Sequence, residues 1–218
     1  MAKTSEIIIL SAIELFNTNG VNNVRLQDIA KHAGISAGNL AYHYNLKKDL
    51  IEAVQQHMTD RWDDMRQANI SYLDQDDYIN VTKAYITVQI NYRFFYRDIL
   101  DIIQINPSTK DLYQHQIQRV IKFSENSMYL AVGKGYIISE PHSGHFRTFA
   151  KNTWAILNSA LTERAVFGKE EAPWERSIED IWELHYPYLT EKGKEIFYYV
   201  KEQLPQTISG EVEMIKTK

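Results

Sequence analysis

The stretch from Leu26 to Tyr44, LQDIAKHAGISAGNLAYHY, predicts two short helices joined by a tight turn. Apolar residues at helical spacing indicate the first helix over 26–33, and Gly34 then supplies a backbone that tolerates a positive φ. Ser36 is the predicted N-cap of a second helix over 37–43, because its hydroxyl can accept from a free backbone N–H. The outward face of this second helix is small and polar, as a helix that enters a DNA groove requires.

Helices are predicted on both sides of this motif. The first covers about 3–19 and ends at Gly20, and its core stripe consists of Ile9, Ala12, Ile13 and Phe16. Another begins near Leu46, with Asn45 as its possible cap, and continues toward Trp62. Together with Ile35 and Leu40, which anchor the outward-facing helix on the core, these segments predict a small helical domain at the N-terminus.

The rest of the chain is also predicted to be helical, because few segments alternate with the period of two that a half-buried strand shows. We expect helices at about 76–104, 109–136, 143–168, 175–186 and 188–204. The first of these is expected to split or kink near Tyr92–Phe95, and the second near Gly133–Gly135. The polar segment 205–218 is expected to be a frayed tail. The predicted fold class is therefore all-α.

Composition excludes several kinds of function. The 218 residues include no cysteine, which excludes disulfides, thiolate catalysis and cysteine-ligated metals. The net charge of −4 gives no global nucleic-acid signal, so any basic surface must be local. We find no nucleophile–base pattern, no glycine-rich phosphate loop and no HExxH motif, so the chain is not expected to be an enzyme or to need a cofactor. His142 and His145 lack further ligands in the sequence, so no metal site is expected.

The first fifty residues resemble the DNA-binding domain of the TetR family of transcriptional regulators. The resemblance runs from IELFNTNG through QDIAKHAGISAGNLAYHY to LKKDLIEAV, and it covers about a quarter of the chain. It implies a helix-turn-helix DNA-binding domain over 1–50 and a larger helical effector-binding and dimerisation domain over 51–204. No apolar run is long enough to span a bilayer, and no signal-peptide pattern is present, so we expect a cytoplasmic regulator that does not bind membranes.

The same resemblance implies which residues contact double-stranded DNA. Ala37–Tyr44 would form the recognition helix, and Lys47 would contact a phosphate from the start of the fourth helix. The candidate DNA-binding residues are Arg25, Ala37, Gly38, Asn39, Tyr42, His43, Lys47 and Lys48. Their chemistry agrees with this role, because Asn can read an adenine edge with two hydrogen bonds and Lys or Arg can neutralise phosphates.

The middle and late helices suggest two further roles. Aromatic side chains could line an apolar cavity for an unknown small-molecule effector, or they could simply fill the core; the candidates are Tyr85, Tyr92, Phe95, Phe123, Phe149 and Trp154. Apolar faces on the late helices could pair two protomers into a homodimer, or pack within one protomer; these faces contain Trp154, Leu157, Leu161, Ile178, Ile181, Trp182, Leu189, Ile196, Phe197 and Val200.

The predicted function is that of a ligand-responsive repressor, which binds a palindromic operator as a homodimer. The alternative is a helical protein-interaction module in which DNA recognition has degenerated. Ala37 and Ala41 favour this alternative, because they stand where the family frequently has a lysine and an aromatic residue. Activation of transcription would use the same parts as repression, and the sequence does not distinguish the two.

Overall fold

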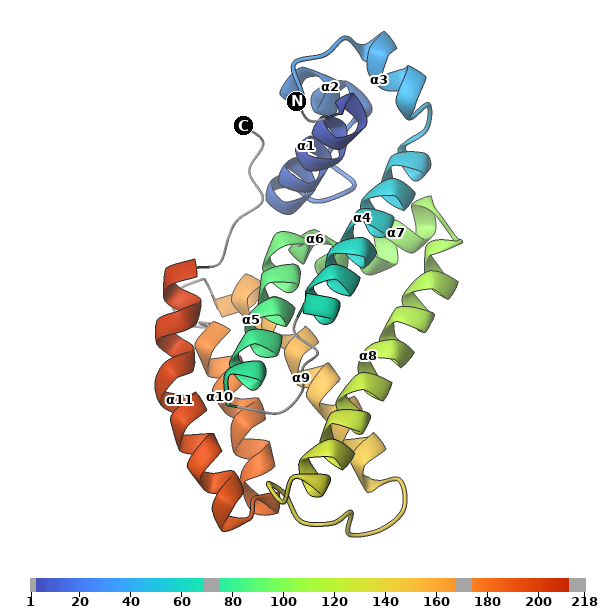
Figure 1. The fold of residues 1–218 in the computed structure, drawn as a ribbon. Coiled ribbons are helices and arrows are strands. Elements are labelled where there is room, and N and C mark those ends of the chain that lie inside the picture. The colour runs from blue at the N-terminus through green and yellow to red at the C-terminus, as the bar shows by residue number, and fades with distance from the viewer. Residues whose placement is uncertain (1–2, 69–74, 168–173, 212–218) are drawn as a thin grey trace. The chain divides into compact units, whose positions relative to one another are not determined.

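The computed structural model describes residues 3–68, 75–167 and 174–211, and every regular element in these ranges is a helix (Figure 1). The helices are α1 (Thr4–Asn19), α2 (Leu26–His32), α3 (Ala37–His43), α4 (Lys47–Ala68), α5 (Gln75–Asn91), α6 (Arg93–Arg97), α7 (Ile99–Ile105), α8 (Thr109–Gly133), α9 (His145–Phe167), α10 (Trp174–His185), the short 3-10 helix η1 (Tyr186–Tyr188) and α11 (Glu191–Glu211). The all-α prediction is therefore confirmed. None of these described helices is both long and apolar enough to cross a membrane.

The chain divides into two compact units, which we describe separately. The first includes Met1–Ala68 and Ala84–Leu112, and the second includes Tyr113–Val212 and the part of α5 that precedes Ala84. The predicted boundary at residue 50 does not coincide with these units, since α4, α6 and α7 belong to the same unit as α1–α3. The boundary at residue 50 separates the predicted DNA-binding domain from the predicted effector-binding and dimerisation domain, and this division by function stays a proposal.

In the first unit, α1 packs against α2, α4 and α6, and α2 packs against α3. The buried face of α1 includes Ala12, Ile13 and Phe16 as predicted, while Ile9 is only partly buried and Ile8 is buried instead. Apolar side chains of α4 complete this core, namely Leu50, Ile51, Val54 and Met58. The helix-turn-helix is thus fixed on a long helix that continues well beyond it.

The segment predicted as one helix over 76–104 consists of three. The chain breaks at Tyr92, between α5 and α6, and again at Asp98, between α6 and α7, which confirms the expected interruption near Tyr92–Phe95. The first break is held by Asn17 of α1: its Nδ2 donates to the carbonyl of Asn91 at 2.7 Å, and its Oδ1 accepts from the N–H of Phe94 at 3.1 Å. These bonds satisfy backbone groups that a broken helix leaves without helical partners.

The second unit contains most of α8 and all of α9–α11, and α10 packs against both α9 and α11. As expected near Gly133–Gly135, α8 ends there: Gly135 has a φ of 74°, and the N–H of Tyr136 donates to Ala131 O at 2.9 Å. This is the hydrogen bond that closes a helix end of the Schellman type. A small core next to this turn contains Met128, Ala131, Ile137, Phe146 and Phe149.

The end of the chain corrects one prediction. Residues 205–211 continue α11 and are not a frayed tail, although Pro205 lies among them. A proline within a helix removes one N–H donor and can kink the helix without ending it. The rest of the predicted tail, 212–218, lies outside the described residues, as do the side chains of Leu161 and Ile178.

Candidate nucleic-acid interface

Helix α3 presents an outward face with little bulk, and local chemistry explains why it forms. Gly34 has a φ of 68°, and the N–H of Ile35 donates to Ala30 O at 3.0 Å, which ends α2 and turns the chain. The hydroxyl of Ser36 then accepts from the N–H of Asn39 at 3.1 Å, as predicted for the N-cap. Leu40 is 1% exposed and anchors the helix on the core.

The predicted outward residues of this helix are all exposed, namely Ala37, Gly38, Asn39, Ala41, Tyr42 and His43. Tyr42 is the most prominent of them, because 86% of the residue is exposed, and its ring forms a T-shaped pair with the His43 ring at a centroid distance of 5.3 Å. An amide, a phenol and an imidazole therefore lie on a helix that is otherwise small. Such a surface can approach base edges closely and donate hydrogen bonds to bases or phosphates.

Arg25 lies exposed immediately before α2. The carboxylate of Asp28, three residues after Arg25, accepts from the backbone N–H of Arg25 at 2.8 Å, which is one of the two hydrogen bonds of a capping box. This bond occupies the backbone of Arg25 and leaves its guanidinium at the surface. The placement is compatible with the predicted phosphate contact.

The two lysines at the start of α4 occupy different environments. Lys48 is exposed, whereas Lys47 is half-buried: its Nζ donates to the carbonyl of Val21 and lies 5.9 Å from the centroid of the Phe16 ring. Burial lowers the pKa of Lys47 below its ordinary value. The structure thus places Lys47 against the α1–α2 loop.

The N-terminus of α4 is capped differently from our expectation. Asn45 was the predicted cap, but the helix begins at Lys47, and the carboxylate of Asp49 accepts from the N–H of Leu46 at 3.1 Å. An acidic side chain in the first helical turn can reach back to a free backbone N–H and also interacts favourably with the helix dipole. The side chain that caps α4 therefore comes from Asp49, within the first turn of the helix, and not from a residue before it.

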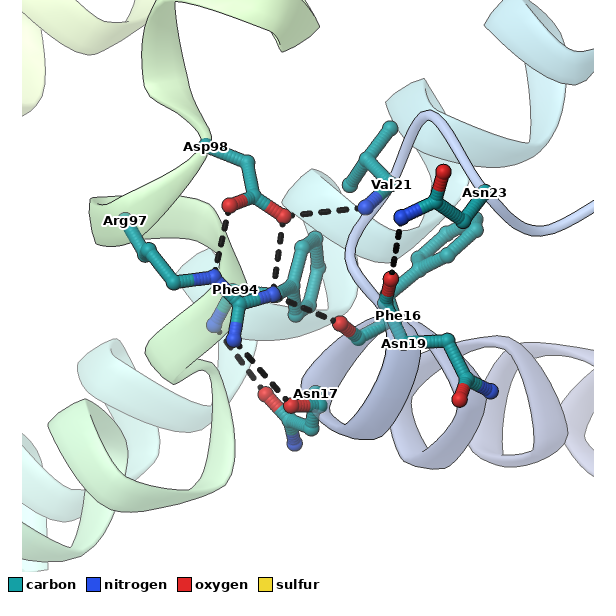
Figure 2. Close-up of polar contacts among 8 residues, drawn as sticks. All are labelled: Phe16, Asn17, Asn19, Val21, Asn23, Phe94, Arg97 and Asp98. Carbon is teal, nitrogen blue, oxygen red and sulfur yellow. Dashed lines mark hydrogen bonds and ion pairs between the residues drawn. The ribbon is translucent and has the colours of Figure 1, made fainter. Parts of the chain in front are cut away.

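A polar cluster that the sequence analysis missed connects the α6–α7 junction to the end of α1 (Figure 2). The guanidinium of Arg97 donates to Phe16 O at 3.0 Å and to Asn17 O at 3.3 Å, which satisfies carbonyls at the end of α1. Arg97 also forms an ion pair with Asp98, with Nε and Oδ1 at 2.6 Å, and Asp98 Oδ2 accepts from the N–H of Val21 at 2.9 Å.

The charges in this cluster stabilise each other. Burial alone would raise the pKa of Asp98, but hydrogen bonds from Arg97 and from the Val21 N–H lower it below its ordinary value. The hydrogen bond to Asp98 raises the pKa of Arg97. The only sequence signal for the cluster is Asn17, a polar residue next to Phe16 on the buried side of α1, since Arg97 and Asp98 resemble ordinary surface charges in the sequence.

The six candidate pocket residues are divided between the two units. Tyr85, Tyr92 and Phe95 belong to the first unit, and Phe123, Phe149 and Trp154 to the second. Tyr92 and Phe95 are buried, and the Tyr92 hydroxyl lies 2.7 Å from Nδ1 of His57 in α4. Burial raises the pKa of Tyr92 and lowers that of His57. Tyr92 therefore contacts the helix whose first turn carries Lys47 and Lys48.

Aromatic rings gather in the second unit as well. Phe149 packs edge-on against His185 and Tyr188, with centroid distances of 4.6 and 5.6 Å, while Phe123 and Trp154 are half-buried. His145 lies 5.0 Å from His142, measured between ring centroids, and its Nε2 is 3.0 Å from the Tyr188 hydroxyl. Among the described residues, no group of three or more His, Cys, Asp or Glu side chains could hold a metal ion.

Comparisons with known proteins agree with this geometry. The family model described as "Bacterial regulatory proteins, tetR family" matches residues 8–54, and the TetR model described as "Bacterial transcriptional repressor" matches residues 53–197. A 53-residue segment is 36% identical to the HTH-type transcriptional repressor BepR of Brucella suis biovar 1 (strain 1330), and it covers 24% of this chain and 25% of that protein. The chain therefore matches only a quarter of the length of this relative.

Solved structures share the fold over nearly the whole chain. A TetR-family transcriptional regulator from Marinobacter aquaeolei VT8 has a TM-score of 0.84 and 24% sequence identity, over 93% of this chain and 99% of that one. A putative transcriptional regulator from Saccharomonospora viridis, solved in complex with choline, has a TM-score of 0.70 and 17% identity, over 86% of this chain and 97% of that one.

Proposed function

Because the chain belongs to the TetR family of bacterial regulatory proteins, and is thus a helix-turn-helix transcriptional regulator, we propose that it represses transcription from a near-palindromic operator as a homodimer. Two copies of α3 would enter successive major grooves, about 34 Å apart or a multiple of this distance. The observation that carries the proposal is the exposed face of α3, on which Tyr42 projects from a helix fixed by Leu40 and Ser36.

The proposed DNA contacts come from three places around this helix. Asn39, Tyr42 and His43 would contact bases or phosphates, while Ala37 and Gly38 allow the backbone to approach closely. Arg25 before α2 and Lys48 at the start of α4 would neutralise phosphates. Lys47 belongs to the same predicted set, but its Nζ donates to the carbonyl of Val21. Residues 1–50 would thus form the DNA-binding domain.

Residues 51–204 would bind an effector and another protomer. The pocket candidates include Tyr92, at the break between α5 and α6, which contacts α4 through His57, so an effector that displaced Tyr92 would also act on α4. Such a ligand would release DNA because it binds the DNA-free conformation more tightly than the DNA-bound conformation. The corresponding coupling free energy is typically about 1–3 kcal/mol. The regulator from Saccharomonospora viridis was solved with choline, and the effector of this chain is proposed only as a small apolar or flat molecule.

The proposed homodimer would form through the late helices. Ile196, Phe197 and Val200 are buried within the second unit, so they are part of its own core. Exposed apolar side chains remain on the same helix and on α9, including Tyr198 and Tyr199 of α11 and Val166 of α9. TetR regulators are generally non-enzymatic DNA-binding proteins, so we propose no catalytic activity. The proposed location of the protein is the cytoplasm, where its operator would lie.

Selection of bound duplexes from a random DNA library tests this function. We expect a palindromic consensus whose affinity falls steeply with salt and weakens about tenfold or more, equivalent to about 1.4 kcal/mol, in Tyr42→Ala. Tyr129→Ala is the matched control, because Tyr129 is an exposed tyrosine of α8 in the other unit, and it should leave affinity unchanged. If folded protein enriches no duplex at low salt, with or without candidate effectors, the interaction-module alternative is favoured.

A further inference from the structure

The side chain of Lys47 is directed toward the protein. Its Nζ donates to the carbonyl of Val21 and lies over the ring of Phe16. The adjacent Lys48 is exposed. A lysine that contacts phosphate gives its ammonium to the DNA, and Lys47 would have to give up its bond to Val21 to do so. The geometry therefore gives these two lysines different roles.

Both backbone polar groups of Val21 are bound by charged side chains. Its N–H donates to Asp98 Oδ2 at 2.9 Å, while its carbonyl accepts from Lys47 Nζ, and the Val21 side chain is fully buried. The N–H belongs to the peptide between Gly20 and Val21 and the carbonyl to the peptide between Val21 and Asn22, so two charge-assisted bonds fix the backbone on both sides of one buried Cα. We therefore expect the two interactions to be coupled.

Through these two bonds, Val21 links separate elements of the first unit. Val21 lies in the loop between α1 and α2, Lys47 begins α4, and Asp98 occupies the α6–α7 junction. Asp98 is paired with Arg97, which also binds the end of α1 (Figure 2). The four segments thus share one polar network within the first unit.

We propose that Lys47 is a positioning residue and not a phosphate ligand: together with Asp98 it holds the backbone of Val21 and thereby orients the helix-turn-helix on α4 and on the α6–α7 junction. This inference rests on the proposed DNA-binding function and refines its contact set. Removal of Lys47 would weaken DNA binding because the orientation of α3 becomes less well defined. It would not remove a charge from the interface with DNA.

Two measurements on the full-length protein separate these roles, with Lys47→Met, Asp98→Ala, the double variant and the control Lys48→Met. The first is the melting temperature without DNA at a fixed protomer concentration. Lys47→Met and Asp98→Ala should each lower it, and the double variant should lower it by less than the sum, because both bonds fix the backbone of the same residue. Lys48→Met, at an exposed position, should leave it unchanged.

The second measurement is the affinity for the selected duplex at several salt concentrations. Each lost phosphate contact reduces the slope of log K against log salt by about 0.9. Lys47→Met should weaken binding several-fold at every salt concentration while the slope stays that of the wild type. A slope reduced by about 0.9, or an unchanged melting temperature, would overturn the proposal.

A failure of the proposed function has a different signature. In that case the wild-type protein itself binds no duplex, and the DNA-binding part of this inference falls with it. The melting temperatures still show whether Lys47 and Asp98 jointly hold the backbone of Val21, since that measurement needs no DNA.

Discussion

Asn17 provides the sharpest test of how the helix-turn-helix is attached to the rest of the first unit. Its side chain is buried, with 8% of the residue exposed, and it makes two hydrogen bonds to backbone groups 74 and 77 residues away, at the break between α5 and α6. Asn17→Leu keeps a side chain of similar size and removes both bonds. The carbonyl of Asn91 and the N–H of Phe94 would then lose these buried partners.

The expected loss follows from these two groups. A buried backbone donor or acceptor left unsatisfied costs about 1–3 kcal/mol, so two of them cost roughly 2–6 kcal/mol. The added apolar surface of leucine offsets about 1 kcal/mol of this, given about 25 cal/mol per Å². We therefore expect a loss of about 3 kcal/mol, equivalent to a decrease in melting temperature of about 6–12 °C for a chain of this size.

Urea denaturation followed by circular dichroism, without DNA and at a fixed protomer concentration, measures this loss. Thr18→Ala is the matched control in the next position of α1, because Thr18 is exposed and its hydroxyl bonds only within its own helix, to Glu14 O at 2.9 Å. That control should change stability by less than about 0.5 kcal/mol. If Asn17→Leu also stays below about 0.5 kcal/mol, the two bonds do not hold the helical break and our reasoning is wrong.

Three further predictions concern other parts of the chain. Ser36→Ala removes the N-cap of α3 and should cost about 1 kcal/mol in the same denaturation assay, together with weaker DNA binding. Gly193→Ala places a Cβ 1.9 Å from the backbone carbonyl of Tyr136, so α11 must shift, and calorimetry should show a loss of about 2 kcal/mol or more. Burial lowers the pKa of His57 in the folded protein, so the unfolded state binds more protons and stability falls as the pH drops below about 6.5; His57→Gln should flatten this dependence between pH 7.5 and 5. The first prediction is wrong if Ser36→Ala is as stable as the wild type, and the second if Gly193→Ala leaves the calorimetric transition unchanged. The third is wrong if the stability of His57→Gln depends on pH as steeply as that of the wild type.

The parts predicted well from sequence are those that neighbouring residues specify. The positive φ of Gly34, the cap by Ser36 and the buried position of Leu40 all follow from residues within ten positions of each other. The exposure of the α3 face then follows from helical periodicity alone. Short-range chemistry of this kind needs no knowledge of the remaining chain.

The parts predicted poorly depend on partners distant in the sequence. The interior position of Lys47 depends on a carbonyl 26 residues away, and the role of Asp98 on an N–H 77 residues away. In the sequence, both look like surface charges. The continuation of α11 past Pro205 is a second kind of failure, because a proline signals a possible helix end but does not show whether the helix continues.

Substitutions on the exposed face of α3 and substitutions in the buried polar network should have different effects on DNA binding. Asn39 and Tyr42 are exposed on α3, so substitutions there alter what the helix contacts while the buried core is unaffected. Asn17, Val21 and Asp98 are not among the predicted DNA-contact residues, yet they fix the α1–α2 loop from which α2 and α3 continue. A different operator sequence should therefore arise from changes on the exposed face. Changes in the buried polar network should alter affinity for all operators together, because they change how the whole helix-turn-helix is held.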